Sequence, residues 1–165
     1  MQNMTKRGVT YVQQGEGNPL YLVGDLYTFK VTSEETNGVF ALWEAVIPPQ
    51  AGPPPHIHHR EDESFYIVEG ELEFLEEDRT FVASAGSFVY IPRGTVHRFK
   101  NVGTQTSRAL MMVTPAGFEK MFEEIGTPAT DPSAPPPPPG PEDIEKLLAV
   151  APKYGLEILP PAEQQ

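Results

Sequence analysis

The chain of 165 residues contains no cysteine. This absence excludes disulfide bridges, thiolate metal sites and cysteine nucleophiles together. Any metal ion bound by this protein must therefore be held by imidazole nitrogens and by oxygen ligands. Histidine is scarce as well, since there are only four, and three of them (His56, His58 and His59) fall within four consecutive positions. This clustering is the first local sign of chemistry in the sequence.

Long apolar runs and positive charge are also lacking. The sequence has no apolar run long enough to span a membrane, and its first residues lead into no export signal. We therefore expect a cytoplasmic protein with no membrane partner. Twelve Lys and Arg against 23 Asp and Glu give a formal net charge of -11. Because this charge repels phosphate backbones, we expect no nucleic-acid partner.

Residues 9 to 113 consist of short runs rich in Val, Phe, Tyr and Leu, separated by Gly, Pro, Asn and Asp. The pattern predicts many short strands in an antiparallel sandwich or barrel, without a helix of clear periodicity. Glu69-Gly70, between two of these runs, predicts a tight hairpin turn. The runs are Leu20 to Val23, Tyr27 to Val31, Val39 to Ile47, Ser64 to Val68, Glu71 to Leu75, Thr80 to Val82, Ser87 to Ile91, Val96 to Phe99 and Ser107 to Val113.

The pattern changes after Pro115. Phe118, Met121, Phe122 and Ile125 recur at helical spacing, which predicts an amphipathic helix that ends at Gly126. Residues 1–126 are thus expected to form a barrel with one following helix. The length of the chain suits a single domain with a tail.

A proline-rich segment follows at residues 127–140, with five consecutive prolines from 135 to 139. It predicts an extended polyproline II spacer, with an SH3-type ligand as the alternative. Residues 141–165 begin with proline and acids and present Ile144, Leu147 and Leu148 to one side of a second helix. We expect this helix and tail to pack on the barrel or on a partner subunit; a disordered tail is the alternative.

Two segments carry the candidate chemistry. The first reads His56-x-His58, four residues, Glu63, six residues, Gly70. In an extended strand alternate side chains share a face, so His56 and His58 can both point inward, and a turn then brings Glu63 into the next strand. The second reads Gly86, five residues, Pro92-x-Gly94, two residues, His97, three residues, Asn101. Pro92-Arg93-Gly94 forms a turn that redirects the chain so that His97 begins a strand.

Each histidine taken alone would more often be an ordinary surface or core residue, but the two segments together match the pair of signature motifs of the cupin superfamily. The match departs only in the leading glycine of the first motif, because Gly52 stands closer to His56 than is common in the family. The resemblance implies an all-β jelly-roll barrel, a double-stranded β-helix, with a metal inside and often a homodimer. It assigns the metal ligands to His56, His58, Glu63 and His97, and it gives none to His59, which should face outward.

The ligand set permits one divalent transition metal ion, which could be Fe, Mn, Ni, Co, Cu or Zn. Alternation from Glu63 and His97 places Phe65, Ile67 and Phe99 on the inner face, and Phe40 and Met111 are further candidates for a substrate pocket. Core packing is the alternative role for all five. Arg60, Arg93 and Arg98 flank the motifs and could bind an anionic substrate, with solvated surface charge as the default.

The proline-rich first motif and the helical tail resemble small bacterial cupins related to quercetin dioxygenases. The resemblance implies a metal-dependent dioxygenase for a small aromatic or enol substrate, with dioxygen as co-substrate and Glu63 as catalytic base. Two alternatives stay open, because fold does not imply chemistry. One is a non-catalytic protein that binds a small molecule on the metal, and the other is a metal-dependent isomerase or decarboxylase.

Overall fold

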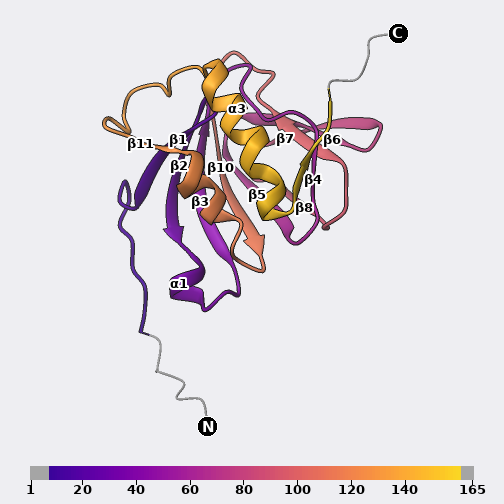
Figure 1. Ribbon diagram of the computed structural model, residues 1–165. Coiled ribbons are helices and arrows are strands. Elements are labelled where there is room, and N and C mark those ends of the chain that lie inside the picture. Colours follow the sequence, from indigo (N-terminus) through magenta and orange to yellow (C-terminus); the bar gives the residue numbers. More distant parts are fainter. Residues whose placement is uncertain (1–7, 161–165) are drawn as a thin grey trace.

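Two antiparallel sheets make up most of the computed structural model, which describes residues 8–160 (Figure 1). In order across the sheet, the larger one contains β11 (Thr127–Pro128), β1 (Asn18–Leu22), β2 (Asp25–Val31), β3 (Ala41–Ile47), β10 (Ser107–Thr114), β5 (Asp62–Glu69) and β8 (Phe88–Ile91). The smaller one contains β12 (Leu156–Ile158), β4 (His56–His58), β9 (His97–Lys100), β6 (Glu71–Glu76) and β7 (Arg79–Ser84). The predicted all-β fold is confirmed.

Strict alternation of side chains creates the core between the sheets. In β3 and β10 every second residue is buried, and Trp43 lies opposite Met111 in the register of these neighbours. Phe65 of β5 in the larger sheet contacts Phe74 of β6 and Phe99 of β9 in the smaller sheet, with ring centroids 5.0 and 5.5 Å away. The barrel interior is therefore filled with side chains at this level.

The hairpin predicted at Glu69-Gly70 is wrong. β5 belongs to the larger sheet and β6 to the smaller one, and the two strands do not pair with each other. Gly70 has φ +76°, and a Cβ added there would lie 2.5 Å from Ser107 Oγ. The glycine thus bends the chain from one sheet into the other at a point of close packing. Turn residues reveal a change of direction, but they do not reveal which strands pair.

The predicted amphipathic helix is confirmed as α2 (Glu119–Ile125), which ends at Gly126. It buries Met121, Phe122 and Ile125, and Phe118 is buried at its N-cap. A single helical turn, α1 (Ser33–Thr36), was not predicted, because four residues are too short to show periodicity.

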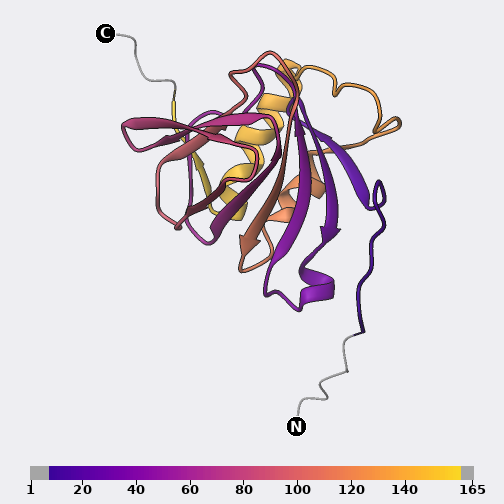
Figure 2. The ribbon, with the colours of Figure 1, turned by 180° about the vertical axis from the view of Figure 1, so that it is seen from behind.

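After β11 the chain crosses residues 129–140 without regular structure and then forms α3 (Pro141–Val150), the 3₁₀ turn η1 (Ala151–Tyr154) and β12. In its course the proline-rich segment touches the barrel, where the Asp131 carbonyl accepts a hydrogen bond from the Tyr21 hydroxyl. α2 and α3 lie on one side of the sheets in Figure 1, and in Figure 2 the strands lie in front of them. β12 pairs with β4, so the C-terminal segment completes the smaller sheet.

Of the three residues predicted to form the apolar side of this second helix, Leu147 is buried, while Ile144 and Leu148 are exposed. The segments predicted at residues 1–126 and 141–165 each have an end that lies outside the described part of the chain, namely residues 1–7 and 161–165. Between residues 8 and 160, no helix has the length and apolar character needed to cross a membrane.

Candidate metal centre

Four side chains from both sheets meet in the barrel interior. His56 and His58 come from β4, His97 is the first residue of β9, and Glu63 comes from β5. One nitrogen or oxygen atom of each lies within 4.8 Å of those of the other three, and all four residues are buried. Pairing of β4 with β9 places His56 directly opposite His97. The structure therefore brings together the four residues that the sequence motifs single out.

Backbone carbonyls orient two of the imidazoles. His56 Nδ1 lies 2.8 Å from the Pro54 carbonyl oxygen, and His97 Nδ1 lies 2.9 Å from the Thr95 carbonyl oxygen. Since a carbonyl only accepts hydrogen bonds, each Nδ1 donates, and each Nε2 keeps a lone pair in the neutral ring.

The Nε2 atoms converge on the carboxylate. His97 Nε2 and His58 Nε2 lie 3.0 and 3.4 Å from Glu63 Oε2. Three imidazole nitrogens and one carboxylate oxygen form a donor set that suits a divalent transition metal ion. The residues present thus fit the cofactor that the motifs imply.

Burial and mutual charge set the protonation of the four side chains. Burial, assisted by His97 and His58, lowers the pKa of His56 to about 3, so this ring is neutral. Burial alone would lower the pKa of His58, but the negative charges of Glu63 and Glu61 outweigh it and raise that pKa to about 9. Burial alone would raise the pKa of Glu63, but His58 and His97 lower it further than burial raises it. The carboxylate is therefore ionised, as a metal ligand must be, and a metal ion would displace the proton that the two glutamates hold on His58.

Two neighbours of the motif histidines play different parts. Glu61 is buried, and its Oε2 lies 3.7 Å from His58 Nδ1, too far for a hydrogen bond but close enough to act through charge. The sequence reasoning missed this carboxylate, although an acidic residue three positions after His58 was a visible signal. His59 faces outward and pairs with Glu157 of β12, with 2.7 Å between Nε2 and Oε2. It thus helps to hold the C-terminal strand.

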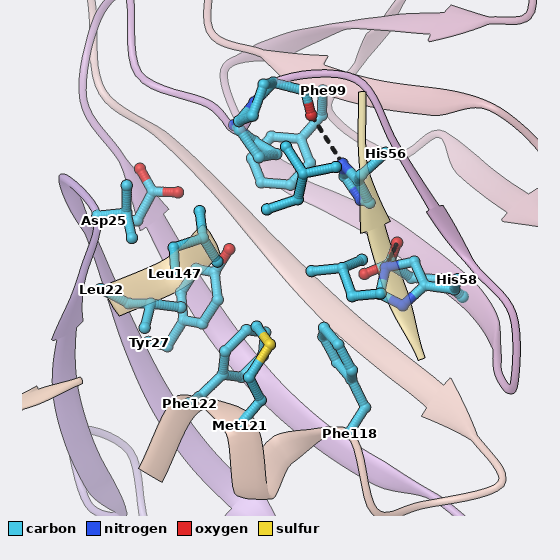
Figure 3. A pocket seen from close by; sticks show the side chains of 16 residues that line it. Leu22, Asp25, Tyr27, His56, His58, Phe99, Phe118, Met121, Phe122 and Leu147 are labelled. Atoms are coloured by element: carbon cyan, nitrogen blue, oxygen red, sulfur yellow. Dashed lines mark hydrogen bonds and ion pairs between the residues drawn. The ribbon is translucent and has the colours of Figure 1, made fainter. Parts of the chain in front are cut away.

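An apolar cavity adjoins the four residues (Figure 3). Its volume is about 70 Å³, enough for roughly five water molecules. His56, His58 and Glu63 form part of its wall. The apolar lining comes from Leu22, Val23, Pro53, Pro54, Phe99, Phe118, Met121, Phe122, Leu147, Leu156 and Ile158. Helix α2 and the C-terminal segment therefore close a space that the sheets alone would leave open.

Of the residues predicted to line a substrate pocket, only Phe99 lies on the wall of this cavity. Phe65, Ile67 and Met111 are buried, as their alternation predicts, but they are packed in the core away from the cavity. Phe40, just before β3, is half-buried and does not line it either. For Phe65, Ile67 and Met111, burial away from this cavity fits the alternative role in core packing. Alternation tells which face a side chain occupies, but it does not tell how deep along the barrel that side chain lies.

None of the three arginines that flank the motifs reaches the cavity. Arg93 pairs with Asp62 at 2.9 Å and Arg98 with Glu73 at 2.8 Å. Arg60 donates a hydrogen bond to the Lys153 carbonyl. Their default interpretation as surface charges fits these contacts better than a role in binding an anionic substrate.

Two further polar side chains, Asp25 and Tyr27 of β2, line the cavity, and the sequence reasoning missed both. Their exposed fractions are 4% and 6%. The Tyr27 hydroxyl interacts with the Asp25 carboxyl group and by itself would lower the pKa of that group. Burial outweighs this effect and raises the pKa of Asp25 well above its ordinary value. The only signal in the sequence was an acidic residue beside apolar positions at the start of a strand.

The raised pKa of Asp25 predicts a pH dependence of stability. The folded chain holds this proton more tightly than the unfolded chain, so the contribution of Asp25 is fully present below the unfolded pKa of about 4 and is lost as the pH rises toward the folded pKa. In Asp25→Asn this loss should vanish. Above pH 5, the difference in unfolding free energy between the variant and the unaltered protein should shift in favour of the variant by up to about 1.4 kcal/mol per pH unit. Urea unfolding at several pH values measures this difference, and parallel pH profiles would contradict the assignment.

Comparison with known proteins adds a family and several relatives. The cupin domain matches residues 43–113. Quercetin 2,3-dioxygenase from Aspergillus japonicus is 34% identical over 113 residues, covering 64% of this chain and 32% of that protein. The protein of the same name from Bacillus subtilis is 26% identical over 121 residues, covering 73% and 36%. The chain thus spans about a third of the length of these two relatives.

A relative of more similar size is polyketide synthase CurC from Streptomyces cyaneus, 32% identical over 108 residues that cover 64% of this chain and 69% of that protein. Among solved structures, KdgF from Halomonas sp. has a TM-score of 0.58 at 18% identity, with 67% of this chain and 96% of that chain covered. A predicted oxalate decarboxylase from Thermotoga maritima has a TM-score of 0.58 at 21% identity, with 64% and 98% covered. At such identities, the structures support the fold alone.

Proposed function

This chain belongs to the cupin family, and on that premise we propose that it is a metal-dependent dioxygenase that acts on a small aromatic or enol substrate. The observation that carries the proposal is the buried set of three histidines and one glutamate beside an apolar cavity. The similarity to two quercetin dioxygenases supports the choice of reaction.

His56, His58, Glu63 and His97 would hold one divalent transition metal ion, of which Fe, Mn, Ni, Co, Cu and Zn are all compatible with the ligands. When bound, the ion supplies Lewis acidity and open coordination positions for a substrate oxygen and dioxygen. The imidazoles of His56 and His97 are held in place for this by the Pro54 and Thr95 carbonyls.

Glu63 is our candidate for the catalytic base. Its carboxylate is ionised, lines the cavity and is therefore in reach of a hydroxyl group that enters it. Taking the proton from an enol or phenol hydroxyl would leave the substrate oxygen negatively charged and more easily oxidised. The Nε2 atoms of His58 and His97 lie 3.4 and 3.0 Å from Glu63 Oε2 and help to hold the carboxylate in place.

The apolar wall selects the substrate and excludes water. Phe118 at the N-cap of α2 and Phe122 within α2 offer flat, apolar surface to a ring, and Leu147 and Leu156 of the C-terminal segment add further apolar surface. A volume of about 70 Å³ favours a single small ring over a three-ring flavonol.

Exposed apolar side chains on the edge of the larger sheet favour the predicted homodimer. Tyr66 and Val68 of β5 and Phe88 and Tyr90 of β8 all project to the surface, and Tyr66 lies opposite Phe88. Such a patch is typical of a protein interface. The homodimer stays a prediction that the molar mass in solution would decide.

Oxygen uptake tests the proposed reaction. The protein would be loaded in turn with Fe, Mn, Ni and Co and mixed with catechols, 1,3-diketones and flavonols. We expect uptake that requires both the metal and a substrate, with single-ring compounds preferred over flavonols. Turnover without oxygen would favour the isomerase or decarboxylase, and recovery of an unchanged bound ligand in air would favour the non-catalytic binding protein.

A further inference from the structure

Asp25 and Tyr27 are the polar side chains of the cavity wall that the proposed metal centre does not use. Apart from them and the three metal-site residues, the wall consists of apolar side chains. Figure 3 shows Asp25 and Tyr27 on one side of the cavity and His56 and His58 on the other. A ligand that fills the space would therefore have the metal centre at one end and this pair at the other.

The fold holds the pair firmly. Asp25 follows a tight turn at Val23 and Gly24, whose φ values are +48° and +91°. Gly24 packs against Pro139 of the proline-rich segment, since a Cβ added to it would lie 3.0 Å from the Pro139 ring. Tyr27 is wedged between aromatic rings, with centroids 5.1 Å from Phe122 and 5.9 Å from Trp43. These contacts restrict the movement of both side chains before any ligand arrives.

One oxygen atom of the Asp25 and Tyr27 pair lacks a hydrogen-bond partner in the described part of the chain. Asp25 Oδ1 is fully buried and has no hydrogen-bond partner within residues 8–160. Buried polar atoms are nearly always paired in native proteins, so an unpaired one at a cavity wall indicates a ligand atom that completes it. A ligand group able to hydrogen-bond there would gain affinity over one that cannot.

The charge of the wall narrows the chemistry of this group. Outside the metal centre the lining contains no Lys or Arg, and the flanking arginines are engaged elsewhere. A carboxylate or phosphate beside Asp25 would be desolvated without a counter-charge, which is costly. Burial raises the pKa of Asp25 and so favours its neutral form, which offers no counter-charge to a cation either. The group is therefore neutral, as a hydroxyl or a carbonyl is.

We propose that Asp25 and Tyr27 form a second recognition point for a neutral oxygen of the substrate. The substrate is then a small flat molecule with oxygen functions at both ends, one for the metal and one for Asp25. This inference rests on the proposed metal centre, because that centre holds the other end of the molecule.

A matched pair of metal-chelating probes tests the inference. Kojic acid and allomaltol chelate metals through the same hydroxyl and ketone groups, but at the far end of the ring kojic acid carries a hydroxymethyl group where allomaltol has a methyl. Calorimetry and the absorption of the cobalt-loaded protein measure binding without any turnover. We expect kojic acid to bind about tenfold more tightly than allomaltol, as one additional hydrogen bond allows.

Asp25→Leu should abolish this preference, so that the two probes bind with equal affinity, whereas Asp25→Asn should retain part of the preference. Continued binding of allomaltol also shows that the variant is folded. Equal affinities in the unaltered protein, or a preference that survives in Asp25→Leu, would overturn the second recognition point while the metal centre stands. If neither probe bound to the cobalt-loaded protein, both proposals would be wrong.

Discussion

We expect His97→Ala to abolish stoichiometric metal binding. His97 lies at the centre of the proposed site, only 1% exposed, with its Nε2 3.0 Å from Glu63 Oε2. Its removal leaves two imidazoles and a carboxylate, and no other described residue offers a replacement ligand at this position. Partners behind the ligands typically change metal affinity by about 10- to 100-fold, so loss of a ligand itself should cost more than this. Titration of the protein with cobalt, followed by absorption, measures the effect.

His59→Ala is the matched control for this experiment. His59 is adjacent in sequence to His58, yet its imidazole is half exposed and pairs with Glu157 at the surface. The control should bind one metal ion per chain with the affinity of the unaltered protein. Loss of metal binding in His59→Ala, with retention in His97→Ala, would reverse the ligand assignment.

Leu147→Ala should destabilise the protein by about 2 to 5 kcal/mol. Leu147 is the buried residue of α3 and lines the cavity, so its truncation leaves a void between helix and barrel. If α3 and β12 can detach from the barrel as a unit, the destabilisation by Leu147→Ala cannot exceed the free energy with which they dock. The measured destabilisation should then fall near the low end of this range. Urea unfolding at equilibrium measures it.

The neighbouring residue provides an internal control. Leu148 belongs to the same helix and is 53% exposed. Leu148→Ala makes the same chemical change without opening a cavity, so its effect should lie within about 0.5 kcal/mol. Equal effects of the two substitutions would mean that α3 does not dock on the barrel in solution as it does in this structure.

The C-terminal segment links these experiments to the proposed chemistry. Leu156 and Ile158 line the cavity, and β12 lies beside the strand that carries His56 and His58. Any change that loosens this segment should widen the cavity and admit water. We therefore expect Leu147→Ala to weaken the preference for single-ring compounds in the oxygen-uptake experiment.

The sequence by itself determined the strands between residues 18 and 114, α2 and the residues of the candidate metal centre, but not the short strands β11 and β12. Apolar alternation is a local property, and it correctly predicted that Glu63, Phe65 and Ile67 share one inward face. The match of the two motifs to the cupin signatures predicted the set of His56, His58, Glu63 and His97 that the structure brings together. The strand predictions succeeded because alternation depends on the chain within a few residues, whereas the ligand set, which joins two distant motifs, came from the resemblance.

Only the tertiary structure decided how the strands were distributed between sheets and what surrounds the metal centre. Gly70 looked like a hairpin turn because its left-handed backbone suits one, but β5 pairs with β10 in the larger sheet, whereas β6 pairs with β7 and β9 in the smaller one. The cavity wall combines Asp25 and Tyr27 of β2, Phe122 of α2 and Leu147 of α3, which are far apart in sequence. Periodicity cannot predict such contacts, because they depend on the docking of separate elements and on the depth of each side chain in the barrel.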